Sequence, residues 1–143
     1  AINKIGAVSN MIHPLAGQSE IVDYLNEVQS KVCLMFTGTF EILKDAIGKT
    51  SVETAVVASP AESLSAIVRG LYKWKSKEPS FSGDTAYMSW RQFIAHGAGT
   101  TLTPIKHDCN ELALISHTGG TTGEPKGVMC SDYNINSLIY PII

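Results

Sequence analysis

The sequence has little cysteine, little imbalance of charge and no long apolar run. Its 143 residues include 3 cysteines, and 11 basic and 13 acidic residues leave a formal net charge of −2. A chain without a broad basic field is not typical of proteins that bind nucleic acid or anionic membranes. Its apolar runs fall short of the ~18 to 20 residues that a membrane-spanning helix needs. We therefore expect neither a nucleic-acid partner nor a transmembrane segment.

The cysteines and histidines do not form a metal-binding pattern. Cys33, Cys109 and Cys130 are odd in number and far apart, and no C-x-x-C pair occurs. The histidines add no ligand spacing, so no metal site is predicted. Reduced thiols fit a cytoplasmic protein, which is the location that we expect. The adjacent His107, Asp108 and Cys109 could suggest catalysis, but contiguous residues rarely face one another, and we favour a polar turn before a strand.

What the sequence does contain is an alternation of strand and helix patterns. With 44% hydrophobic content over 143 residues, the chain can bury the core of one compact domain. Short apolar runs predict strands, and apolar residues three or four apart predict helices. The predicted strands span 5–9, 32–36, 54–58 and 112–115, with a further extended piece at 128–130.

Capping signals mark the predicted helices. Ser59 and Ser89 each stand three residues before Glu or Gln, the pattern of a capping box, and Gly48 and Gly97 can end helices. The predicted helices begin near Ser19, include Phe40 to Ile47, follow Ser59, follow Ser89, and follow Ser131 or Asp132; residues 73–83 and 98–110 are predicted connections. Strands that alternate with helices predict an α/β fold, with a parallel β-sheet flanked by helices.

The strongest functional signal is a loop of glycines, threonines and one lysine at residues 118–127, directly after the predicted strand 112–115. Glycine permits the positive φ angles that turn backbone N–H groups toward one point, and it leaves room for an anion. Threonine hydroxyls add donors, and Lys126 adds a charge that suits a phosphate oxygen. The loop is therefore predicted to hold phosphates.

Two familiar phosphate-binding patterns do not fit this loop. A Walker motif requires Gly-Lys followed by Ser or Thr, whereas here Pro125 precedes Lys126 and Gly127 follows it. The glycines also lack the G-x-G-x-x-G spacing of a dinucleotide-binding fingerprint. A flexible surface loop is the remaining alternative, but ten consecutive positions of this chemistry argue against it.

Residues 118–127 resemble the phosphate-binding signature of the AMP-forming adenylating superfamily, which contains acyl-CoA synthetases, nonribosomal-peptide adenylation domains and luciferases. That signature reads Ser/Thr-Ser/Gly-Gly-Thr-Thr-Gly-x-Pro-Lys-Gly, and every position is met. His117 stands where a Tyr is common, and Asp132 stands where a His often follows. Residues 3–14 are also similar to a segment of acyl-CoA synthetases, so the resemblance covers most of the chain.

The resemblance implies a fold, a reaction and a set of binding residues. Residues 1–143 would form a single α/β subdomain, part of the large amino-terminal domain of an acyl-CoA synthetase-like fold. The enzyme would use ATP with Mg²⁺ to activate a carboxylic acid as an acyl-adenylate, and would then transfer the acyl group to coenzyme A. By this analogy, the residues that bind the ATP phosphates or pyrophosphate are Thr118, Gly119, Gly120, Thr121, Thr122, Gly123 and Lys126.

The family's remaining active-site residues would lie elsewhere. In that family the adenine, ribose and Mg²⁺ motifs and the catalytic lysine all follow the loop at larger distances, so we expect no catalytic residue in this chain. We expect the chain to be an inactive fragment of a longer, fatty-acid–CoA ligase-like enzyme of fatty acid metabolism. The alternatives are an adenylation domain for an amino or aryl acid, and a non-catalytic nucleotide-binding module.

Overall fold

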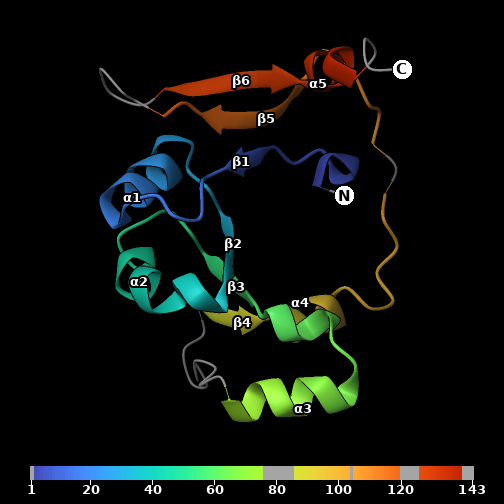
Figure 1. Cartoon of the computed structure of the whole chain (residues 1–143). Coiled ribbons are helices and arrows are strands. Elements are labelled where there is room, and N and C mark those ends of the chain that lie inside the picture. Colours follow the sequence, from blue (N-terminus) through green and yellow to red (C-terminus); the bar gives the residue numbers. More distant parts are fainter. Residues whose placement is uncertain (1, 76–85, 104, 120–125, 140–143) are drawn as a thin grey trace. The chain divides into compact units, whose positions relative to one another are not determined.

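The chain forms two compact units, each with a three-stranded β-sheet (Figure 1). The computed structural model describes residues 2–75, 86–103, 105–119 and 126–139, except for the side chains of 73–75 and 139. One unit comprises Pro14–Thr100, and the other joins Ala1–His13 to Thr101–Ile143. How these residues divide into domains within a longer protein stays a prediction.

The sheet of the Pro14–Thr100 unit is wholly parallel. Its strands, in spatial order, are β2 (Val32–Phe36), β3 (Thr54–Ala58) and β4 (Tyr87–Ser89). β2 and β3 begin and end where they were predicted. β4 was not predicted, because a strand of three residues is too short to show the alternation by which strands are recognised.

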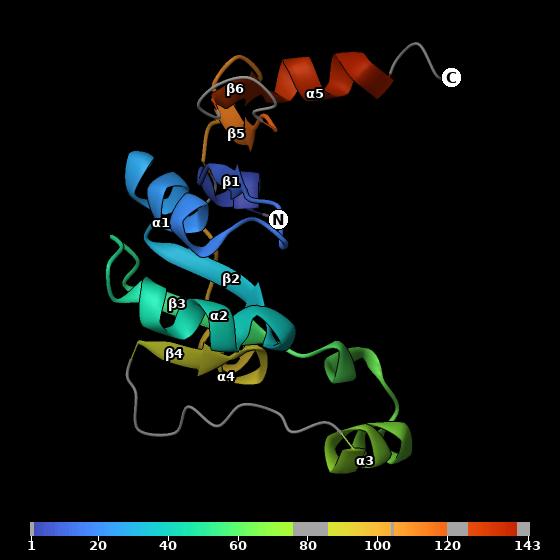
Figure 2. The ribbon, with the colours of Figure 1, turned by 60° about the vertical axis from the view of Figure 1, so that its left-hand side comes forward.

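Helices pack against this sheet. The described helices of the unit are α1 (Gln18–Glu27), α2 (Thr37–Ile47), α3 (Ala66–Lys75) and α4 (Trp90–His96). Figure 2 shows α1 and α2 beside β2 and β3, and α4 beside β4. The buried apolar residues of the unit are Ile21, Tyr24, Leu25, Met35, Phe40, Leu43, Ala46, Ile47, Ala55, Val56, Val57 and Ala61.

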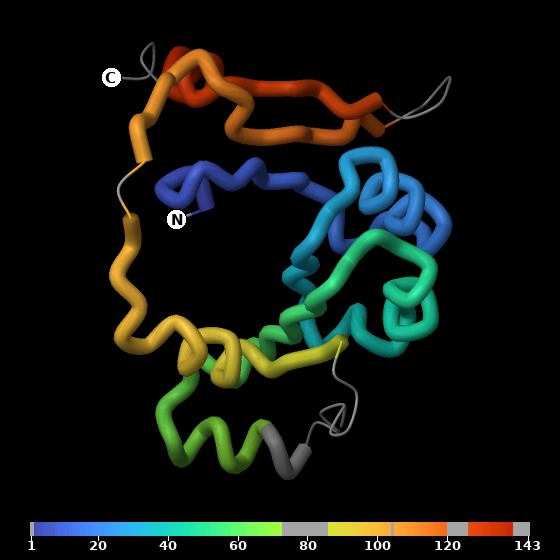
Figure 3. The backbone as a smooth tube through the Cα atoms, turned by 180° about the vertical axis from the view of Figure 1, so that it is seen from behind, coloured from blue at the N-terminus to red at the C-terminus, as the bar shows by residue number. Residues whose placement is uncertain are grey.

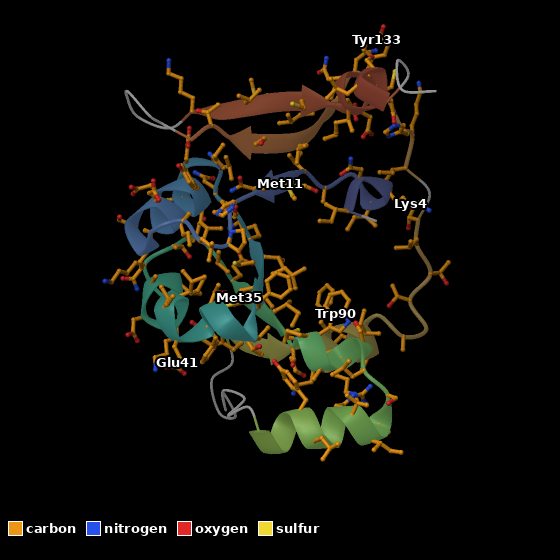
Figure 4. All side chains as sticks on the ribbon, in the orientation of Figure 1. Lys4, Met11, Met35, Glu41, Trp90 and Tyr133 are labelled. Atoms are coloured by element: carbon orange, nitrogen blue, oxygen red, sulfur yellow. The ribbon has the colours of Figure 1, made fainter. Side chains whose placement is uncertain are left out.

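Side-chain alternation separates the two faces of this sheet, because successive residues of a strand point to opposite sides. Met35, labelled in Figure 4, is 5% exposed. Val32, Leu34 and Phe36 alternate with it and are 55%, 62% and 57% exposed. At β2 the buried side is therefore the Met35 side, whereas at β3 Val56, the partner of Leu34, is buried on the opposite side.

The predicted ends of α2 and α4 and the predicted start of α4 are confirmed. Gly48 follows the last residue of α2 and Gly97 follows the last residue of α4. Ser89 and Gln92 form the predicted capping box: the Ser89 hydroxyl accepts from the Gln92 N–H at 3.3 Å, and Gln92 Oε1 accepts from the Ser89 N–H at 2.9 Å. α1 begins one residue earlier than predicted, with Gly17 as its N-cap.

The helix predicted after Ser59 is wrong in its first half. Ser59 does cap a turn, since its hydroxyl accepts from the Ala61 N–H at 3.1 Å, but this turn is a 3₁₀-helix that ends at Ser63. Leu64 is extended, with φ −87° and ψ 151°, and α3 starts only at Ala66. Residues 73–75, predicted as a connection, belong to α3, and residues 76–85 lie outside the described part of the chain.

The second unit contains a mixed sheet in the spatial order β1 (Ser9–Met11), β5 (Leu112–His117) and β6 (Gly127–Ser131). β1 pairs with β5 in parallel, whereas β5 and β6 are antiparallel. The predicted α/β class is confirmed, and this antiparallel pair is its one departure from a purely parallel arrangement among the described residues. Strands 112–115 and 128–130 were predicted slightly short, and helix α5 (Asp132–Ile139) follows as predicted.

The predicted strand at 5–9 is displaced. Residues Ile2–Ile5 form a 3₁₀-helix, and the Gly6 N–H closes it by donating to the Asn3 carbonyl at 3.1 Å. Gly6 has φ +73°, which ends the turn and delays the strand until Ser9. Residues 98–103 and 105–110 contain neither helix nor strand, as predicted (Figure 3). Among the described residues, no helix combines the length and apolarity that crossing a membrane requires.

Candidate phosphate-binding hairpin

The hairpin β5–β6 carries both ends of the glycine- and threonine-rich loop. β5 ends at His117, β6 begins at Gly127, and these two residues are partners in the antiparallel register. The structure describes four of the ten loop residues: Thr118, Gly119, Lys126 and Gly127. The other predicted binding residues, Gly120, Thr121, Thr122 and Gly123, lie outside the described residues, so their role stays a prediction.

Hydrogen bonds close the base of this loop. The Thr118 N–H donates to the Lys126 carbonyl at 3.0 Å, and the Lys126 N–H donates to the Thr118 hydroxyl oxygen at 3.2 Å. The same hydroxyl lies 3.4 Å from the Lys126 carbonyl oxygen. We call this pair of residues the neck. Thr118, Gly119 and Lys126 are all exposed, so the groups predicted to bind phosphate are accessible at the neck.

The neck adds a role for Thr118 that its residue type alone did not reveal. We predicted its hydroxyl as a donor to phosphate, and in the structure the hydroxyl accepts from the backbone of Lys126. A threonine oxygen has two lone pairs and one O–H, so it accepts from the Lys126 N–H and can also donate, over 3.4 Å, to the Lys126 carbonyl. The hydroxyl therefore positions Lys126, while its contact with phosphate stays a prediction.

A histidine directly before the loop bonds to the neighbouring strand β1. His117 Nε2 lies 2.7 Å from Asn10 Oδ1, and both side chains are half-buried. Because a carboxamide oxygen only accepts, this geometry assigns the hydrogen to Nε2 of the ring. A Cβ atom on Gly127 would lie 3.6 Å from His117 Cε1, so the ring also lies close to the first residue of β6.

Asp132 joins three segments at the other end of β6. Its Oδ1 accepts from Asn3 Nδ2 at 3.0 Å, and its Oδ2 lies 3.1 Å from His107 Nε2. The Asp132 side chain is only 20% exposed. Its carboxylate therefore links the amino-terminal 3₁₀-helix, the long connection and the start of α5.

His107, Asp108 and Cys109 form the polar turn that we favoured. Asp108 Oδ1 accepts from the Asn110 N–H at 2.9 Å, and the Cys109 carbonyl accepts from the Tyr133 N–H at 2.9 Å. His107 is directed to Asp132 rather than to the Cys109 thiol. These contacts are structural and assemble no nucleophile with a base.

The Cys33 thiol is poorly suited to act as a second reactive group. Cys33, Cys109 and Cys130 are free, and burial raises the pKa of the Cys33 thiol to about 11. A thiol with so high a pKa is a poor nucleophile at neutral pH. Within the described ranges, no group of three or more His, Cys, Asp or Glu residues could hold a metal ion.

Sequence reasoning missed the contact between Asn10 and His117. These residues are 107 positions apart, and neither belongs to a motif that pairs them. The only signal was that His117 replaces the Tyr that is common before the loop. The position of β1 beside β5, which brings the two side chains together, was not predictable from their spacing.

Known proteins similar to this chain are larger. The acetyl-coenzyme A synthetase of Pseudoalteromonas atlantica is 26% identical over 129 residues, which cover 90% of this chain and 19% of that protein. The long-chain-fatty-acid–CoA ligase of Salmonella typhimurium is 25% identical over 139 residues, which cover 94% of this chain and 25% of the ligase. The chain thus spans about a fifth to a quarter of the length of these relatives.

A solved structure also resembles this chain in its fold. The crystal structure of an anthranilate–CoA ligase in complex with anthranoyl-AMP matches 99% of this chain and 24% of its own, with a TM-score of 0.71 at 19% identity. The sequence also matches the AMP-binding enzyme family over residues 1–142. This chain therefore belongs to the family of AMP-binding enzymes.

Proposed function

We propose that the chain is part of an AMP-forming acid–thiol ligase, in which the hairpin β5–β6 binds the phosphates of ATP. The observation that carries this proposal is the neck, where Thr118 and Lys126 bond to each other through backbone and hydroxyl groups. The neck presents an exposed lysine beside an exposed threonine and glycine. Such a cluster offers a positive charge and several donors to one anion.

The chemistry of the first step calls for these groups. A carboxylate oxygen attacks the α-phosphorus of ATP, the bond from that phosphorus to the bridging oxygen breaks, and pyrophosphate leaves. Negative charge then grows on the leaving pyrophosphate, and donors already aimed at it lower the barrier. We assign this role to Lys126 and Thr118, with the predicted Gly119, Gly120, Thr121, Thr122 and Gly123 completing the grip.

The second step joins the acyl group to a thiol. The sulfur of coenzyme A attacks the acyl carbon of the adenylate, and AMP leaves. We assign no residue of this chain to that step, and no Mg²⁺ ligand, because no group of three suitable ligands occurs in the described residues. The free thiols fit a reducing cytoplasm, which is the location that we propose. We expect the 143 residues alone to be inactive.

Coenzyme A is favoured as the acceptor because both curated relatives described above carry CoA ligase or synthetase names and match at least 90% of this chain. Acetyl and long-chain acyl groups are the substrates that those names give. We propose a fatty acid as the carboxylate. An aryl acid is the second candidate, because the structure of the anthranilate ligase has a similar fold.

The test uses the full-length protein that contains this chain. ATP–pyrophosphate exchange is measured with acetate, a medium-chain and a long-chain fatty acid, and anthranilate, and CoA consumption is then measured with the best acid. Acid-dependent exchange followed by thioester formation supports the proposal. Exchange without CoA consumption would instead indicate an adenylation domain that serves another acceptor, and no exchange with any acid would indicate a non-catalytic module.

A further inference from the structure

We propose that Asn10 and His117 form a positioning pair that sets the orientation of the phosphate-binding loop. This inference rests on the proposed function, because it concerns how the loop at 118–127 is presented to ATP. It starts from the 2.7 Å contact between His117 Nε2 and Asn10 Oδ1. The pair joins the last residue of β5 to the middle of β1.

The register of the sheet explains why these side chains meet. Asn10 is the partner of Ile115 in the parallel pair of β1 and β5, and His117 is two residues beyond Ile115. Residues two apart on a strand point to the same face. Asn10 and His117 are therefore diagonal neighbours on one face, close enough for long side chains to meet.

The same ring reaches the other side of the hairpin. His117 pairs with Gly127 in the antiparallel register, and a Cβ atom on Gly127 would lie 3.6 Å from His117 Cε1 and 3.8 Å from Nδ1. These are ordinary van der Waals distances, so the ring lies beside the backbone of β6 at Gly127. The ring is thus held by Asn10 on one side and adjoins Gly127 on the other.

Both contacts act on the ends of the loop. His117 is bonded directly to Thr118, and Gly127 is bonded directly to Lys126, so the ring adjoins the two residues that form the neck. We infer that loss of the contact with Asn10 would let the end of β5 shift against β1, and with it the backbone of the neck. Misplacement of donors by even about 1 Å weakens catalysis and binding strongly. Neither Asn10 nor His117 needs to touch ATP for this effect.

The test compares variants of the full-length protein that keep or remove the donor. His117→Phe keeps a ring but removes the N–H, Asn10→Leu removes the acceptor, and His117→Gln replaces the ring but retains a donor near the Nε2 position. The matched control is Asn3→Leu, which removes a hydrogen bond of similar length, 3.0 Å to Asp132, at the other end of β6. The readouts are the KM values for ATP and for the acid, kcat of the exchange reaction, and the thermal midpoint.

We expect His117→Phe and Asn10→Leu each to raise the KM for ATP about five- to tenfold, the value of one well-made hydrogen bond. The KM for the acid should stay within about twofold of the wild-type value, and His117→Gln should recover most of the ATP affinity. The double variant should be no worse than the single ones, because both remove the same contact. Asn3→Leu should lower the thermal midpoint without changing the KM for ATP.

Several results would overturn the inference. A His117→Phe protein with a wild-type KM for ATP would do so, as would equal rises in the KM for ATP and for the acid. A rise in the KM for ATP in Asn3→Leu would indicate general destabilisation instead. If the wild-type protein shows no exchange with any acid, the proposed function fails, and calorimetry of ATP and pyrophosphate then decides the inference. In that case the inference is overturned if His117→Phe binds ATP and pyrophosphate as tightly as the wild-type protein, or if the wild-type protein binds neither.

Discussion

Two hydrogen bonds join Thr118 to Lys126. The Thr118 N–H donates to the Lys126 carbonyl at 3.0 Å, and the Lys126 N–H donates to the Thr118 hydroxyl oxygen at 3.2 Å. The first and the ninth positions of a ten-residue signature are therefore joined by the protein's own groups. Because closing a loop costs conformational entropy, a neck that is already closed reduces what a phosphate must supply on binding.

Removal of the Thr118 hydroxyl should open this neck. In Thr118→Val the Lys126 N–H loses its acceptor while the side chain keeps its shape, so we expect a loss of about 1 kcal/mol in ATP binding. Thr118→Ser keeps the oxygen and should bind ATP within about twofold of the wild-type protein. Calorimetry with ATP and with pyrophosphate measures both variants. Equal affinities in the Val and Ser variants would mean that the hydroxyl neither positions Lys126 nor contacts phosphate.

Replacement of Lys126 should slow formation of the acyl-adenylate more than formation of the thioester. Lys126→Ala removes the positive charge proposed to face the leaving pyrophosphate, so ATP–pyrophosphate exchange should slow about 100-fold. Thioester formation from preformed acyl-adenylate should fall far less, because pyrophosphate has already left. Lys106→Ala, at an exposed lysine in the long connection, is the control and should change neither step. Equal losses in both steps would argue against a role specific to phosphate.

Two glycines of the loop should respond differently to alanine. A Cβ on Gly127 would lie 3.1 Å from Ile115 Cγ2, and Ile115 is buried in β5, so we expect Gly127→Ala to cost about 1 to 3 kcal/mol of stability. A Cβ on Gly119 would meet nothing within 4 Å. Gly119→Ala should therefore leave the thermal midpoint unchanged while weakening ATP binding. A stable Gly127→Ala protein would show that the hairpin can shift to accommodate the methyl group.

Arg69 should not tolerate replacement by lysine. Its Nε donates to the Ala61 carbonyl at 3.2 Å, and its Nη2 lies 3.4 Å from the Glu62 carbonyl oxygen and 2.9 Å from that of Leu64. A lysine ammonium cannot reproduce this fork. We expect Arg69→Lys to increase hydrogen exchange in residues 60–66 without changing ATP affinity. Arg91→Lys, at an exposed arginine of α4, is the control. Equal hydrogen exchange in residues 60–66 of both variants would show that the hydrogen bonds of Arg69 do not stabilise this segment.

Some parts of this chain could be predicted from local sequence patterns and others could not. β2 and β3 were predicted with their observed bounds, because apolar residues cluster there and turn residues flank them. The helix after Ser59 was predicted wrongly, because the carbonyl groups that Arg69 binds belong to residues five to eight positions before it, and no local pattern reports such a contact. The loop was singled out from the order of its residues and their match to a family signature, and its role in binding phosphate stays a prediction. The support of this loop by Asn10 was not predicted, because only the pairing of β1 with β5 brings that side chain to His117.

Cys33 should react with alkylating reagents only at high pH. Burial raises the pKa of this half-buried thiol to about 11, and only the thiolate is nucleophilic. Below that pH, each unit of pH should therefore raise the rate of alkylation about tenfold. Exposed Cys109 should be modified first when the native protein is treated with iodoacetamide and its peptides are mapped by mass spectrometry.

The raised pKa of Cys33 determines how the stability of the protein changes with pH. Between the ordinary cysteine pKa of about 8.5 and the folded value of about 11, the unfolded chain releases a proton that folded Cys33 retains. The free energy of unfolding should thus fall as pH rises through this window, and Cys33→Ala should flatten that fall. Alkylation in denaturant, where all three thiols react alike, is the control. If the alkylation rate of Cys33 in the native protein levels off near pH 9, burial does not keep the proton on this thiol.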